Sequence, residues 1–193
     1  AIPEELDDVA VWVRQQVAIS LARLQQPCLY GLLLHRPLQL TEPHGHRLWR
    51  TLEQLKSDGL IRKWGISVYA PEELVQVFAL YRPDVVQAPF NLLDQRLPRS
   101  GWLDRLVDMG VETHARSVFM QGLLLLPGGA RPPWFGRWQT LWDRWHAWLQ
   151  DHPEASPLAV CQSFVLSYPG IDRLVVGVDS LQQFLQVLRS EEH

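Results

Sequence analysis

A run of mostly apolar residues, CLYGLLLHRP at positions 28–37, ends abruptly in a histidine, an arginine and a proline. A strand buried in a core has little use for such an ending, whereas a strand that delivers a side chain to a reaction site does. The imidazole N–H of a neutral histidine can donate a hydrogen bond to a reacting group. His35 is therefore the first candidate for chemistry in this sequence.

Four later apolar runs also end in residues that a core does not require. These residues are Ser67, Gln87 with Asn91, Arg116 with Ser117, and Gly177. Polar residues also end strands simply because loops are solvated, and at any single position that explanation is equally good. That five consecutive predicted strands end in such residues favours a shared functional site, since parallel strands bring their carboxyl ends together.

The elements that position these residues alternate along the chain. Helical spacing of apolar residues covers 4–24, 45–58, 101–110 and 157–168, and further helices begin at Pro71, in the Trp-rich segment and near Asp179 or Ser180. Between them lie apolar runs at 27–34, 60–68, 84–91, 111–118 and 172–178, and the first is predicted to be buried on both faces. Such alternation predicts parallel strands joined by right-handed helical crossovers. Because no GxGxxG turn follows the first strand, an incomplete barrel is favoured over an open dinucleotide-binding sheet.

Composition narrows the class of protein. With 193 residues, 47% hydrophobic and 20% charged, the chain is predicted to form a single globular domain, 1–193. A net charge of −3 without a basic block gives no support for nucleic-acid binding. No apolar run approaches the roughly 20 residues of a membrane span, and no signal peptide is recognised in the sequence. Cys28 and Cys161 are expected to be free thiols, which suggests the cytoplasm. The pair His44 and His46 lacks a third ligand at useful spacing, so no metal is expected.

Five segments together resemble the aldo-keto reductases, in that family's order and roughly its spacing. They are LLLHRP, LEQLKSDGLIRKWGISVY, DVVQAPFNLLDQR, HARSVFMQGLL and LVVGVDSLQQF, and the resemblance covers nearly the whole chain. It implies a (β/α)8 TIM barrel that transfers a hydride from a nicotinamide cofactor to an aldehyde or ketone. The QAPFNLLDQR and ARSVFMQGLLLL segments resemble a bacterial branch associated with sugar or polysaccharide metabolism.

The resemblance also implies roles for particular residues. His35 matches the histidine that orients the substrate carbonyl, and Ser67 and Gln87 match residues that contact the nicotinamide carboxamide. The remaining matches to the cofactor site are Arg116 near the nicotinamide, Ser117, Gln121 and Gly122 along the pyrophosphate, Gly177 and Val178 by the phosphates, and Gln183 near the adenine ribose. NADPH is the expected cofactor and NADH the alternative. Val68 and Val187 replace the family's usual asparagines.

The family's catalytic tyrosine, lysine and aspartate lie in its first three βα units, and no tyrosine or lysine here matches them. The chain is therefore expected to be the carboxyl-terminal five-eighths of a reductase barrel, holding about five βα units and inactive alone. The alternative is a truncated, non-catalytic barrel that binds a nucleotide or a partner. A third option, a barrel hydrolase, is disfavoured because no carboxylate pair stands at the strand ends. A small carbonyl compound is the expected substrate, and the sequence leaves the oligomeric state open.

Overall fold

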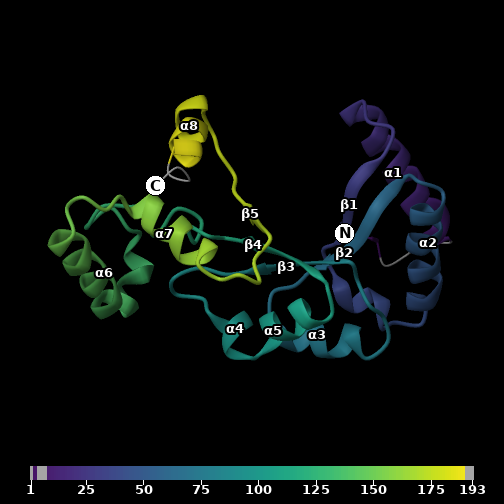
Figure 1. Ribbon diagram of the computed structural model, residues 1–193, viewed down its shortest axis with the longest axis horizontal. Coiled ribbons are helices and arrows are strands. Elements are labelled where there is room, and N and C mark those ends of the chain that lie inside the picture. Colours follow the sequence, from purple (N-terminus) through teal and green to yellow (C-terminus); the bar gives the residue numbers. More distant parts are fainter. Residues whose placement is uncertain (1, 4–7, 190–193) are drawn as a thin grey trace. The chain divides into compact units, whose positions relative to one another are not determined.

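Helices and strands alternate through the chain in the computed structural model, which describes residues 2–3 and 8–189 (Figure 1). This order is the one that the apolar spacing predicts. The chain forms two compact units. The first comprises Ala1–Pro89 and Arg96–His114, and the second comprises Phe90–Gln95 and Ala115–His193.

Parallel strands form the centre of the first unit. Strand β1 (Leu29–Leu34) pairs with β2 (Ile61–Ser67), and β2 pairs with β3 (Val85–Pro89), both in parallel. Strand β4 (Glu112–Arg116) begins in this unit and ends in the second, where β5 (Arg173–Val175) follows. The strand order β1-β2-β3-β4-β5 equals the chain order, so each connection joins neighbouring strands. The predicted crossover topology is confirmed.

Helices of the first unit begin and end where local chemistry predicts. They are α1 (Val9–Leu24), the 3-10 helix η1 (Pro37–Leu40), α2 (Gly45–Ser57), α3 (Pro71–Phe78), α4 (Arg96–Arg99) and α5 (Trp102–Asp108). Asp8 caps α1 by accepting a hydrogen bond from the Ala10 N–H at 2.8 Å, and the predicted start at 4–7 lies outside the described residues. Gly59 ends α2 with a φ of +71°, a backbone conformation that glycine adopts without strain.

The prediction that β1 is buried on both faces is wrong. Tyr30 and Gly31 are exposed, and only Leu34 at the end of the strand is fully buried. The physical reason is position, because β1 is an edge strand with β2 as its one neighbour in the sheet. The core of this unit lies instead along β2 and its flanking helices, with Leu52, Trp64 and Ile66 at most 1% exposed.

The second unit is mainly helical. It contains the 3-10 helix η2 (Pro133–Trp138), α6 (Gln139–Asp151), α7 (Pro157–Leu166) and α8 (Leu181–Arg189). Helix α7 lies within the predicted range 157–168, and Ser156 caps it, since its hydroxyl accepts the Ala159 N–H at 3.0 Å. Phe90 packs edge-on against Tyr168 and at a tilt against Phe164, which anchors α7. Within the described residues, no helix has the length and apolar character needed to cross a bilayer.

Candidate active site

The first unit brings three of the predicted site residues together at the carboxyl ends of its strands, which form one edge of the sheet. Residue Leu34 pairs with Ile66, so His35 follows β1 at the level where Ser67 ends β2, and Ser67 itself pairs with Gln87. The buried Ser67 hydroxyl donates a hydrogen bond to the Gln87 side-chain oxygen at 3.2 Å. This contact orients the Gln87 amide, while His35 is exposed at the same edge.

Val68, which stands where the family usually has an asparagine, supplies no side-chain amide at the carboxyl ends of these strands. Its side chain is 1% exposed, and its backbone N–H donates to the Gln87 carbonyl at 2.9 Å. An apolar side chain packed in the core offers no amide to a ligand, so Ser67 and Gln87 carry the polar contacts at this point.

The second unit contains a pocket of about 540 Å³ lined by six of the predicted cofactor residues. They come from the segment after β4, from the turn between β5 and α8, and from the first turn of α8: Ser117, Gln121, Gly122, Gly177, Val178 and Gln183. Residues about 60 positions apart in sequence therefore share one cavity, as the strand-end argument expects. Arg116 does not line it, but its guanidinium donates to the Ser117 hydroxyl at 3.3 Å.

The pocket wall after β4 has an unusual backbone. In the segment 117–122, four residues have positive φ: Ser117 (57°), Met120 (49°), Gln121 (55°) and Gly122 (85°), and all but Met120 line the pocket. Non-glycine residues in this region cost free energy and persist where the surroundings enforce them, often at functional sites.

Asn91, at the end of β3, holds this wall in place. Its side chain is 2% exposed, and its Nδ2 donates to the Ser117 carbonyl at 3.0 Å. Its Oδ1 accepts the backbone N–H groups of Leu93 and Asp94, each at 2.9 Å. One buried amide thus ties the turn after β3 to the residue that begins the left-handed segment.

The opposite wall is the first turn of α8. Gln183 and Ser180 cap the helix reciprocally: Gln183 Oε1 accepts the Asp179 N–H at 2.7 Å, and Ser180 Oγ accepts the Gln183 N–H at 3.2 Å. The prediction that a helix starts near Asp179 is confirmed. N–H groups of a first helical turn have no acceptor within the helix, and they favour an anion placed beside them.

Gly177 is not explained by packing. A Cβ built on it meets no atom within 4 Å, and it has no positive φ that would require glycine. Its missing side chain leaves space at the pocket instead. The volume falls within the roughly 300–1,000 Å³ typical of small-molecule sites. Among the described residues that line the pocket there is one carboxylate, Asp179, and neither lysine nor arginine.

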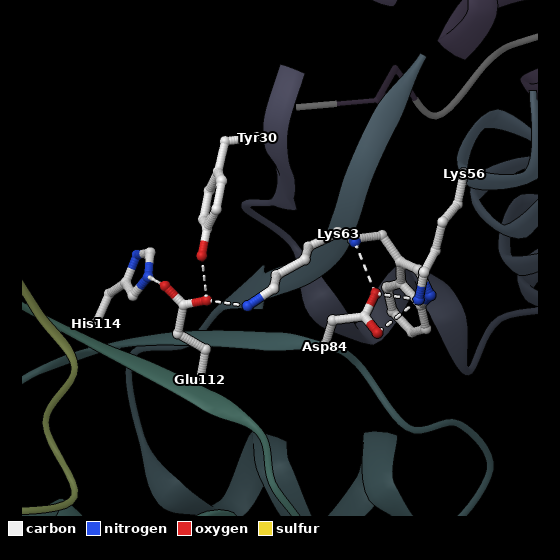
Figure 2. A network of polar contacts seen from close by, with 7 residues as sticks. Tyr30, Lys56, Lys63, Asp84, Glu112 and His114 are labelled. Carbon is white, nitrogen blue, oxygen red and sulfur yellow. Dashed lines mark hydrogen bonds and ion pairs between the residues drawn. The ribbon is translucent and has the colours of Figure 1, made fainter. Parts of the chain in front are cut away.

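A polar cluster that sequence reasoning missed lies at the other ends of the strands in the first unit (Figure 2). The nearly buried Glu112 carboxylate forms an ion pair with Lys63, accepts the Tyr30 hydroxyl at 2.5 Å, and contacts His114 Nε2 at 2.7 Å. The hydrogen bond to Glu112 is the main cause that raises the pKa of Lys63. Alternating polar residues in ETHAR (112–116) were the available signal. Since the cluster lies away from His35 along β1, it joins strands rather than serving that edge.

Comparison with known proteins supports the family resemblance that the sequence segments suggest. A family model described as "Aldo/keto reductase family" matches residues 7–193. The aldo-keto reductase AKR11C1 from Bacillus halodurans matches in its holo form with a TM-score of 0.77 and 21% identity, over 97% of this chain and 64% of that one. Its apo form gives 0.76 and 20%, over 96% and 64%. A thermostable aldo-keto reductase, Tm1743, solved with the inhibitor epalrestat, gives 0.67 and 18%, over 94% and 61%.

These matches establish the fold. At this level of identity they show architecture alone, which is the α/β barrel of the reductases, present here in part as predicted. The chain spans less than two thirds of the length of the solved structures that it matches. The comparison with curated proteins finds no match.

Proposed function

Because this chain belongs to the aldo/keto reductase family, we propose that it takes part in NAD(P)H-dependent hydride transfer to an aldehyde or ketone. The observation that carries the proposal is the pocket in the second unit, where six residues that match the family's cofactor site line one cavity. We further propose that 1–193 is one incomplete barrel domain and that it works in the cytoplasm on a small carbonyl compound, a class that includes sugars.

Particular residues would hold the cofactor. Ser67 and Gln87, linked by their hydrogen bond, would bind the nicotinamide carboxamide, and Arg116 would lie near the ring. The strained segment with Ser117, Gln121 and Gly122 would support the pyrophosphate, while Gly177, Val178 and Gln183 would accept the adenosine side. When bound, the reduced nicotinamide supplies the hydride.

His35 would orient the substrate. Hydride addition to a carbonyl leaves negative charge on the oxygen, so a hydrogen-bond donor within reach lowers the barrier. His35 stands exposed at the edge that also carries Ser67 and Gln87, and its imidazole N–H can make that contact.

In our proposal, no tyrosine of this chain serves as the proton donor of the reaction. Tyr30 bonds to Glu112 at the far ends of the strands, Tyr81 stacks on Trp49, and Tyr168 packs against Phe90. Tyr69, which is 66% exposed, does not match the family's catalytic position. We therefore propose that the chain alone binds cofactor without turnover. A specific alternative is a non-catalytic barrel that binds a nucleotide or a partner.

Two measurements test the proposal. Titration of the chain with NADPH and NADH, followed by nicotinamide fluorescence, should show saturable binding that Ser67→Ala weakens. Ser20→Ala is the control and should not weaken it, because the Ser20 hydroxyl donates to the Gln16 carbonyl within α1. Because the pocket lining lacks a cation for a 2′-phosphate, the titration also decides between the two cofactors. No saturable binding of either would overturn the proposal.

The second measurement separates the reductase from the non-catalytic alternative. The chain is joined to the first three βα units of a related reductase, which carry the tyrosine and lysine, and assayed with a simple aldehyde. Turnover that His35→Ala abolishes supports the reductase. Cofactor binding by the joined protein without turnover favours the alternative.

A further inference from the structure

A second cavity, separate from the proposed cofactor pocket, lies between the loop before η2 and one face of α6. It has a volume of about 560 Å³ and is built entirely from 128–150. Helix α6 contributes Gln139, Trp142, Asp143, His146 and Gln150, which recur at the spacing of a single helical face. None of the proposed cofactor residues lines it, so its ligand is a separate question from hydride transfer.

Arg131 makes one wall rigid. Its guanidinium donates to the carbonyls of Leu123 at 3.1 Å and Leu126 at 3.2 Å, and it lies 4.3 Å from the ring of Trp142. Trp142 is 3% exposed, and its indole N–H donates to the Phe135 carbonyl at 3.2 Å. The cavity is therefore preformed, which lowers the entropy lost when a ligand binds.

His146 completes the contacts of Arg131. Its Nε2 lies 2.6 Å from Arg131 Nη1, so the imidazole accepts and is neutral in this arrangement. Burial and the nearby Arg131 charge both lower the pKa of His146, and Asp143 opposes them. The other ring nitrogen, Nδ1, then carries the proton, and it has no hydrogen-bond partner among the residues that the structure describes.

The remaining polar groups can both donate and accept. Gln139 donates to Asp143 Oδ1 at 2.7 Å, which leaves the second carboxylate oxygen and the Gln139 carbonyl as acceptors. The Gln150 amide offers both functions at the exposed end. Asp143 and Arg131 carry opposite charges in the same lining, so the cavity has no net charge that favours an ion of either sign. Mixed donors and acceptors beside the half-buried Phe135 ring match closely spaced hydroxyl groups on a compact carbon skeleton.

We propose that this cavity, between Arg131 and the Gln139–Gln150 face of α6, binds a neutral polyhydroxylated small molecule of the sugar or polyol class. The polar side chains bond the hydroxyl groups, and the Phe135 and proline surfaces contact the carbon skeleton.

Saturation-transfer NMR on the purified chain without cofactor tests this inference. The probes are methyl glucoside and D-mannitol as neutral polyols, D-gluconate as an anion, D-glucosamine as a cation and benzyl alcohol as an apolar compound. We expect transfer to the neutral polyols that is stronger than to the other three. Asp143→Asn and Gln150→Ala should each weaken their binding about tenfold, the usual effect of losing one hydrogen bond to a ligand.

Asp151→Asn is the matched control, because Asp151 is exposed on α6 and does not line the cavity. Circular dichroism verifies that each variant keeps its helices, and the exposed Gln150 keeps the test valid if Asp143→Asn unfolds. Stronger transfer to any ion or to benzyl alcohol, no transfer at all, or equal binding by all variants would overturn the inference. Since no cofactor is present, none of these results depends on hydride transfer.

Discussion

Asn91→Asp is the substitution that best isolates the support beneath the candidate cofactor pocket. An aspartate has the shape of asparagine and keeps the oxygen that accepts the Leu93 and Asp94 N–H groups. An ionised aspartate cannot donate to the Ser117 carbonyl, so the 3.0 Å bond to the left-handed segment is lost and a carboxylate oxygen faces that carbonyl. The change therefore separates the tie to Ser117 from the local turn after β3.

The size of the effect follows from burial. Asn91 is 2% exposed, so the lost hydrogen bond costs about 1–3 kcal/mol, and the buried negative charge beside a carbonyl oxygen adds to this cost. Asn91→Ala removes all three side-chain bonds, so we expect roughly 2–5 kcal/mol. The Met120 N–H still bonds to the Ser117 carbonyl at 2.8 Å, which keeps the Asp variant folded.

Two assays locate the loss. Urea unfolding gives the global free energy, and amide hydrogen exchange reports on the Met120 and Gly122 N–H groups, which bond within the left-handed segment. In Asn91→Asp both amides should exchange at least tenfold faster, and the affinity for NADPH or NADH should fall by a similar factor.

Gln95→Glu is the control, because it makes the same amide-to-carboxylate change in the same turn, where Gln95 donates to the Leu92 carbonyl at 2.8 Å. If Asn91→Asp leaves exchange at Met120 and Gly122 at the rate seen in Gln95→Glu, the idea that Asn91 holds the pocket wall is refuted.

Three further predictions follow from the structure. Gly177→Val should leave the melting temperature unchanged, since a Cβ there meets no atom within 4 Å, but should weaken NADPH or NADH binding at least tenfold in a fluorescence titration. The hydrogen bond to Glu112 raises the pKa of Lys63, so the ion pair stabilises the fold below the usual lysine pKa near 10.5 and this stabilisation is lost as pH rises beyond it. Between about pH 9 and 12, the urea midpoint of the unchanged protein should therefore fall more steeply with pH than that of Lys63→Met. The pKa of His146 is lowered by burial, so stability should fall as pH drops below about 6.5, and His146→Gln, which retains an acceptor for Arg131, should flatten that part of the profile.

The sequence by itself determined the elements and their order. Gly59 ends a helix, Pro71 opens one and Ser156 caps another, because these effects act within a few residues of backbone. Strict alternation of helix and strand then implied parallel neighbours. The family resemblance added the candidate cofactor residues, and six of these share one pocket.

Only the tertiary structure decided what those residues touch. Local patterning could not show that β1 is an edge strand, that Gln183 caps its own helix, or that Asn91 holds Ser117. The partners of Glu112 and the cavity beside α6 likewise became known only from the structure. Burial and charge pairing depend on which distant segments fold against a residue, whereas helix ends and strand periodicity depend on the residues next to it in the chain.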